Sequence, residues 1–142
     1  MKESLSKFQK RTQKESRTIV DNLEKELLKV RFRLERQGKL NATKDFYGAT
    51  TRAGKIRDYQ LTGRLRNSIN AQIKRDDETV QVALIAGRFN GGSILEYAAR
   101  LEFGDPKTRL KPFFYLGRAV QKEQTRIEKD LSRFLKLQLE NL

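Results

Sequence analysis

Apolar residues recur every three or four positions near both ends of the chain and every second position in its middle. Near the start they step by four, four, three and four, at Ile19, Leu23, Leu27, Val30 and Leu34. This spacing puts them on one face of a 3.6-residue helix. We therefore predict a long helix over residues 3–37 of a segment 1–38, ended by a glycine at 38. We expect its apolar face to pack in the core; a seam facing a partner is the alternative.

A second long helix is predicted over residues 113–140. Its apolar stripe is formed by Leu116, Val120, Ile127, Leu131 and Phe134. Beyond this stripe, leucines at 135, 137, 139 and 142 fall on several faces of the helix. We expect this excess of apolar surface to contact a neighbouring molecule.

The middle of the chain predicts a β-hairpin flanked by two short helices. Val80, Val82 and Leu84 alternate with the side chains between them, and residues 71–75 alternate more weakly before a polar turn at 76–78. Such alternation is typical of paired strands. We expect a short helix over 62–69, capped by its threonine, and another over 95–103, stopped by a glycine.

The intervening residues 39–61 have no clear period, which predicts a long flexible loop. The basic residues within it and just after it form a candidate contact region: Arg52, Lys55, Arg57, Arg64 and Arg66. They would meet an acidic neighbour or DNA, or simply face solvent. We favour protein surfaces, because a strongly basic channel wall would hold back moving DNA through phosphate contacts.

These elements predict one α+β domain over residues 1–142, with a small antiparallel sheet packed by the helices. The segments are the helix at 1–38, the basic loop at 39–61, the short helix–hairpin–short helix unit at 62–112 and the helix at 113–142. No internal repeat or linker divides the chain.

Composition removes most enzyme chemistry and points to polyanionic partners. The chain has no Cys, His or Trp, and 31 Lys and Arg against 18 Asp and Glu give a formal net charge of +13. Disulfides, thiolate nucleophiles and imidazole acid–base chemistry are therefore excluded. A basic chain seeks nucleic acid, acidic membranes or acidic proteins. The polar start indicates no signal peptide and no apolar run would span a membrane, so we expect the protein to be made in the cytoplasm.

No catalytic, metal-binding or cofactor-binding residues are predicted. The run Asp76-Asp77-Glu78 would suit Mg²⁺ in a nuclease only if ligands from other elements converged on it. The segment 87–93 is glycine-rich but lacks the Lys and hydroxyl of a phosphate-binding loop. A basic nucleic-acid-binding module remains the alternative from another functional class.

Three segments carry a resemblance to a known family. They are 61–69 (LTGRLRNSI), 97–105 (YAARLEFGD) and 110–114 (LKPFF). In this order they resemble the tail-completion or neck proteins of long-tailed bacteriophages, the group that includes minor tail protein Z of phage lambda. The match covers about residues 60–120. Aspartate at 105 and lysine at 111 depart from the family pattern, and the first helix and the loop lie outside it.

The resemblance implies a structural virion protein rather than an enzyme. It implies a ring, expected to be a hexamer, at the head–tail interface, where the connector or stopper, the tail terminator and the tail tube would be neighbours. Tail terminators and head-completion proteins are alternatives of similar size. The motif residues carried over as candidate subunit-interface residues are Thr62, Gly63, Leu65, Ser68, Ile69, Tyr97, Glu102, Phe103, Gly104, Pro112, Phe113 and Phe114.

Overall fold

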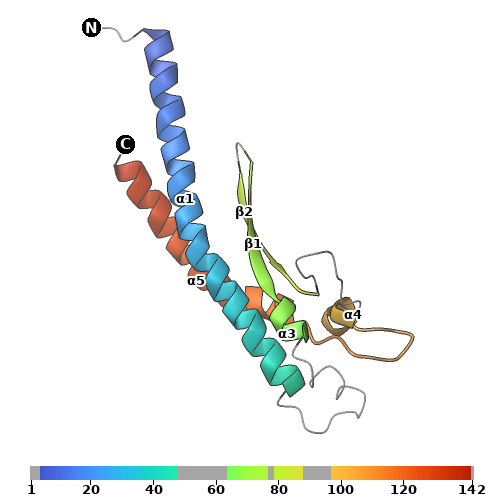
Figure 1. The fold of residues 1–142 in the computed structure, drawn as a ribbon. Coiled ribbons are helices and arrows are strands. Elements are labelled where there is room, and N and C mark those ends of the chain that lie inside the picture. Colours follow the sequence, from blue (N-terminus) through green and yellow to red (C-terminus); the bar gives the residue numbers. More distant parts are fainter. Residues whose placement is uncertain (1–3, 48–63, 77–78, 88–96, 142) are drawn as a thin grey trace.

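The computed structural model describes residues 4–47, 64–76, 79–87 and 97–141. The elements in chain order are helix α1 (Leu5–Ala42), a π-helical turn η1 (Thr43–Tyr47), helix α3 (Arg64–Ser68), strands β1 (Asn70–Arg75) and β2 (Val80–Ile85), helix α4 (Tyr97–Phe103) and helix α5 (Tyr115–Glu140). The predicted α+β class is confirmed. The two long helices cross side by side and run antiparallel, while the hairpin and the short helices lie on one side of them (Figure 1).

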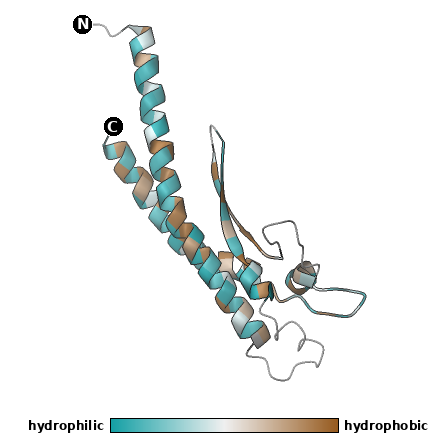
Figure 2. Cartoon of the chain, in the orientation of Figure 1, coloured by the Kyte–Doolittle hydropathy of each residue, from teal (hydrophilic) through white to brown (hydrophobic). Residues whose placement is uncertain are grey.

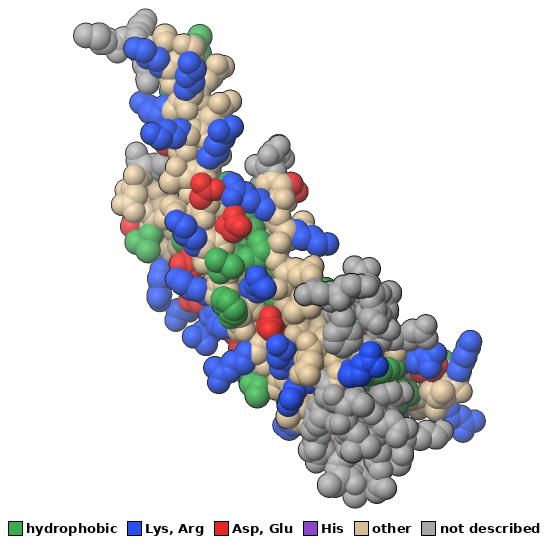
Figure 3. All heavy atoms as spheres, viewed as in Figure 1, with side chains coloured by type: hydrophobic (Ala, Val, Ile, Leu, Met, Phe, Trp, Pro, Cys, Tyr) green, Lys and Arg blue, Asp and Glu red, His purple; other side chains and the backbone are tan. Residues whose placement is uncertain are grey.

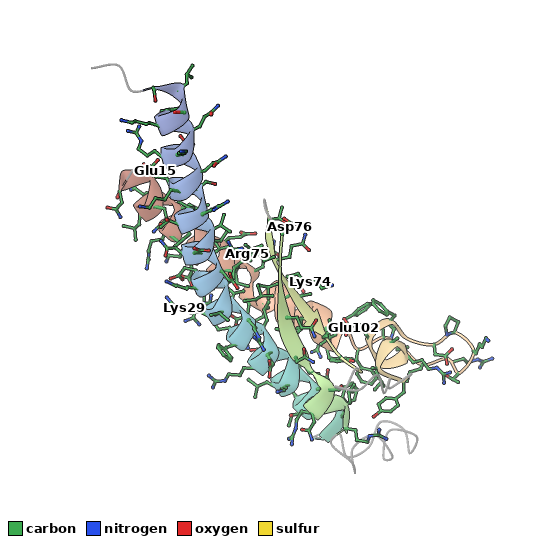
Figure 4. The ribbon with its side chains drawn as sticks, turned by 45° about the horizontal axis from the view of Figure 1, so that its top comes forward. Glu15, Lys29, Lys74, Arg75, Asp76 and Glu102 are labelled. Carbon is green, nitrogen blue, oxygen red and sulfur yellow. The ribbon has the colours of Figure 1, made fainter. Side chains whose placement is uncertain are left out.

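The sheet is a two-stranded antiparallel hairpin, as predicted. Its register pairs Ile73 with Val82 and Ala71 with Leu84. Successive side chains of a strand point to opposite faces, so these four residues share the face that packs on α1. At the turn end of the hairpin Arg75 reaches α1 and forms ion pairs with two of its carboxylates, each at 2.8 Å (Figure 4).

The apolar stripe of α1 packs in the interior, as predicted. We call the resulting cluster the helix core. Its buried residues are Leu27, Val30 and Leu34, packed against the half-buried Leu23, Ile73, Val80, Val82, Leu84, Ile127 and Leu131. Side chains from α1, α5 and one sheet face therefore exclude water together. Figure 2 shows the contrast along α1, whose N-terminal third is mainly hydrophilic; residues 4–18 are all exposed.

A second cluster lies where the short helices meet the ends of the long ones. We call it the joint core. It consists of Ala42, Phe46, Leu65, Ile69, Ala98, Leu101 and Tyr115. Phe46 contacts the rings of Phe113 and Tyr115 edge to face, with centroids 5.0 and 5.6 Å apart. The joint core thus joins the contiguous α1 and η1 to three helices, α3, α4 and α5, that are distant from them in the sequence.

The predicted end of α1 at Gly38 was wrong. The helix continues to Ala42 and then into η1, so the first nine residues of the expected loop 39–61 are helical. Gly38 is buried, and a Cβ built on it would come within 3.1 Å of Ile69 Cγ2. Glycine is therefore explained here by the close approach of the short-helix segment, and it does not terminate the helix.

The start of α5 and one residue of its apolar stripe also differ from the prediction. Helix α5 begins at Tyr115 because Phe114 adopts left-handed backbone angles, with φ 50° and ψ 40°. Within its stripe Val120 is 44% exposed, whereas Ala119 is fully buried. The short helices are confirmed at Arg64–Ser68 and Tyr97–Phe103. The proposed cap Thr62 and the expected start at Leu95 lie outside the described residues.

Candidate interaction surfaces

The carboxylate of Glu102 holds the start of α5. It is almost fully buried, and its two oxygens accept hydrogen bonds from the backbone N–H groups of Leu116 and Gly117, at 2.9 and 2.8 Å. The first N–H groups of a helix have no partner inside the helix and carry partial positive charge, so a carboxylate satisfies them well. Glu102 therefore fixes α4 against α5, and Figure 4 shows it at this junction.

The hydroxyl groups of Ser68 and Tyr115 also form buried hydrogen bonds in the joint core. The Ser68 hydroxyl donates to the Leu65 carbonyl at 2.6 Å and accepts from the Gly87 N–H at 2.8 Å, which connects α3 to the end of β2. The Tyr115 hydroxyl donates to the Ala98 carbonyl at 3.2 Å. Burial, helped by the nearby Glu102 carboxylate, raises the pKa of Tyr115 far above its ordinary value of 10.0. The phenol therefore stays protonated and structural.

Gly104 ends α4 with φ +79°, a conformation that favours glycine. A Cβ there would lie 2.8 Å from the Leu110 carbonyl oxygen and 3.1 Å from Pro112. The chain then returns through a bridge between Asp105 and Leu110, with mutual backbone hydrogen bonds of 3.0 Å. This turn brings the third motif segment back against α4.

The structure gathers the motif residues but buries many of them. Leu65, Ser68, Ile69 and Glu102 are each at most 6% exposed, so their side chains serve this chain's own interior. Their place at a subunit interface stays a prediction, and burial in this chain leaves their side chains little surface for such a contact. Tyr97 and Phe113 are half-buried against the joint core. Thr62 and Gly63 lie outside the described residues.

Phe103 and Phe114 are the exposed aromatic residues among the described motif residues, and Pro112 is exposed as well. The two phenylalanine side chains are 73% and 48% exposed. The Phe114 N–H donates to the Glu102 carbonyl at 3.2 Å, so the two phenylalanines lie on neighbouring backbone segments. Phe114 is also held in a backbone conformation that costs a non-glycine residue about 1–2 kcal/mol. We call this pair the aromatic patch.

The leucines near the end of α5 form a second exposed apolar region. Leu135, Leu137 and Leu139 are 46, 51 and 68% exposed, which confirms that the predicted apolar excess is not absorbed by the fold. Leu135 and Leu139 are one turn apart on the same face. We call these two residues the leucine patch. It lies near the opposite end of α5 from the aromatic patch, about 30 Å away at 1.5 Å per residue.

The basic contact loop can be placed only in part. Arg64 and Arg66 are exposed on α3, and each already interacts with another group of the chain. Arg52, Lys55 and Arg57 lie outside the described residues.

A second basic feature was missed by the sequence analysis. All six cations of α5 fall at intervals of three or four residues: Arg118, Lys122, Arg126, Lys129, Arg133 and Lys136. At 3.6 residues per turn they occupy an arc of about 80° on one face. All six are exposed. We call them the cationic row; Figure 3 shows Lys and Arg side chains crowding the flank of the long helices. Testing the cations for helical periodicity, and not only the apolar residues, would have found this row.

The two end cations of the row form ion pairs, and the four central cations do not. Arg118 pairs with Asp45, whose pKa is raised by burial although the arginine acts to lower it. Lys136 lies 3.9 Å from Glu140. The four central cations form no ion pair with any other residue that the structure describes.

Like charges spaced three or four residues apart on a helix destabilise it by about 0.2–0.5 kcal/mol per pair. The row contains five such neighbouring pairs. Carboxylates on α5 lie mostly outside this face; Asp130, for example, forms a 2.8 Å ion pair with Arg33 of α1. This segregation of charge therefore reduces the stability of the isolated helix.

In the acidic turn, the carboxylate of Asp76 is hydrogen-bonded to Thr79. Asp76 accepts from the Thr79 N–H at 2.7 Å and from the Thr79 hydroxyl at 2.8 Å, while Asp77 and Glu78 lie outside the described residues. Among the residues that the structure describes, no cluster of three or more metal-ligating side chains occurs.

None of the helices that the structure describes has the length and apolar content required to cross a membrane.

Comparisons of this chain with protein-family models, with curated proteins and with solved structures found no match.

Proposed function

We propose that this chain is a non-enzymatic structural subunit of a bacteriophage neck, which joins with copies of itself into a ring that completes the tail at the head–tail interface. Its place would be the virion, after synthesis in the host cytoplasm. The tail terminator and the head-completion protein are the alternative positions within the same structural class.

One observation carries the proposal: two different apolar patches are exposed at opposite ends of α5. A ring with a single repeated interface requires two unlike surfaces on each subunit, because each copy contacts the next head to tail. The aromatic patch and the leucine patch are unlike and lie on separate parts of the molecule. Their exposure is unfavourable for a monomer and is removed if one patch meets the other.

The motif segments give additional support. The described parts of the three segments that carry the resemblance to neck proteins lie together around the joint core, although 27 residues separate the first segment from the second. Glu102, Ser68 and Gly104 have structural roles there that explain their residue types. The resemblance therefore rests partly on residues that position the short helices and the start of α5 around the joint core.

The proposal is tested by complementation between two defective variants of the full chain. One variant, Phe103→Ser with Phe114→Asn, removes the aromatic patch, and asparagine tolerates the left-handed backbone. The other, Leu135→Ser with Leu139→Ser, removes the leucine patch. Mass photometry and electron microscopy of the unmodified chain should show a closed ring, with each variant alone monomeric. A mixture should give a dimer that grows no further, because one intact patch of each kind remains.

The control is Leu5→Ser, which removes an exposed leucine that is 80% accessible and belongs to neither patch. This variant should assemble normally. A chain that stays monomeric, or a leucine-patch variant that still forms rings, contradicts the head-to-tail ring.

A further inference from the structure

The cationic row of α5 is a surface that neither the chain's own packing nor the proposed ring uses. The four central cations, Lys122, Arg126, Lys129 and Arg133, are exposed and lack an ion-pair partner among the described residues. The two patches of the proposed ring contain none of them. Repulsion between the cations of the row destabilises α5, and a bound polyanion would relieve it.

We propose that the cationic row binds the phosphate backbone of double-stranded DNA without reading its sequence. Successive cations of the row are separated by about 4.5–6 Å along the helix axis at 1.5 Å per residue. Each strand of duplex DNA presents a phosphate about every 3.4 Å of its axis. A helix laid along the backbone therefore lets several ammonium and guanidinium groups reach phosphates together.

The chemistry of the row favours DNA over an acidic protein. Protein interfaces concentrate apolar and aromatic side chains at their centre and are depleted of lysine. On one flank of the row centre the helix carries small polar side chains, Thr125 and Ser132, on the other it carries Asp130, and half of the six cations are lysines. Phosphate contacts, in contrast, are made by both lysine and arginine and need no apolar centre.

The row also differs from the basic side chains elsewhere on the long helices. On α1, Lys29 and Lys39 each form an ion pair with a glutamate one turn away, at 2.7 and 2.6 Å. Arg33 is paired with Asp130. These cations form close ion pairs inside the chain, whereas the four central cations of the row form none with the described residues, and the one nearby carboxylate, Asp130, is paired with Arg33.

The experiment measures binding of the full chain to a 20-base-pair duplex by fluorescence anisotropy at several salt concentrations. The row variant replaces Lys122, Arg126, Lys129 and Arg133 by glutamine. The control variant replaces Lys25, Lys74, Lys107 and Lys111 by glutamine; these are exposed on α1, on β1 and in the segment between α4 and α5. Both variants lose four positive charges, so net charge is matched. Circular dichroism and thermal melting verify that each is folded.

Each phosphate contact contributes about −0.9 to the slope of log affinity against log salt concentration. Loss of four contacts should therefore make the slope of the row variant shallower by about three to four, with affinity at least tenfold lower near 0.1 M salt. The control should keep the slope of the unmodified chain within about one unit.

Three results overturn the inference: equal losses in the two variants, an unchanged slope in the row variant, or tighter row-dependent binding to polyglutamate than to DNA. The last would assign the row to an acidic protein. The outcome is independent of the ring, because the row variant retains both apolar patches and its assembly is measured separately by mass photometry.

Discussion

The helix core brings together aliphatic side chains from α1, α5 and one face of the hairpin. The joint core contains aromatic rings together with the buried carboxylate of Glu102 and the hydroxyls of Ser68 and Tyr115. Aliphatic packing tolerates exchanges of similar volume. Buried polar groups do not, because each requires its partner at a fixed distance and direction. The helix core therefore contributes mainly buried apolar area, whereas the joint core fixes the positions of the elements relative to one another.

The largest effect that distinguishes the two cores is expected at Gly104. Gly104→Ala should reduce the free energy of unfolding by about 3 kcal/mol, because a left-handed alanine costs about 1–2 kcal/mol and its Cβ would also press on backbone atoms. Urea denaturation followed by circular dichroism measures the change. A loss below about 1 kcal/mol would mean that the turn after α4 shifts easily and that the joint is not rigid.

A matched pair of conservative substitutions compares the two cores directly. Glu102→Gln keeps the shape of the side chain but removes its charge and turns one acceptor into a donor facing an N–H group, so about 2 kcal/mol of stability should be lost. Leu34→Met keeps the volume of a helix-core residue and should cost about 1 kcal/mol or less. The same denaturation experiment measures both. Equal losses would remove the proposed distinction.

A smaller effect should appear at acidic pH through Glu35, which connects α1 to the start of β1. Burial acts to raise the pKa of Glu35, but hydrogen bonds from the Lys39 ammonium and the Ala71 N–H lower it below its ordinary value of 4.5. A carboxyl group with a lowered folded-state pKa stabilises the fold above its unfolded pKa, and this stability is lost as the pH falls through the folded-state pKa.

We therefore expect the unmodified chain to lose stability between about pH 5 and pH 3 more steeply than Glu35→Gln, by less than about 1 kcal/mol because the site is partly exposed. Denaturation midpoints across this range measure the difference. The raised pKa of Asp45 acts in the opposite direction, favouring the fold at low pH, but it is present in both proteins and cancels in the comparison. Parallel pH profiles would show that Glu35 makes no net contribution.

The sequence predicted the elements that depend on periodic burial. Leu27, Val30 and Leu34 repeat at helical spacing and are buried, and Val80, Val82 and Leu84 alternate and share a buried face. The end of α1 was not predictable in the same way. Glycine often stops helices, and the tertiary approach of Ile69, which explains the glycine at 38, is not visible in the local sequence.

The candidate surface was predicted only in part for a similar reason. A short motif such as 101–104 indicates that its residues matter, but it does not reveal whether a side chain faces inward, like Glu102, or outward, like Phe103. That choice depends on the position of α5, which lies beyond the motif. The cationic row was visible in the spacing of charged residues, yet apolar periodicity alone does not detect it.

Helix α1 is a single unbroken element whose two ends differ greatly in protection. At Val30 it is packed from several sides, whereas its first turns, around Leu5, have solvent around them. A helical segment without tertiary packing is marginal in water and frays from its free end. Local opening should therefore require almost no free energy at the first turn and approach the global unfolding energy near Val30. Amide hydrogen exchange along α1 would form a graded scale, and a partner that covers the first turns would register there as slowed exchange, residue by residue.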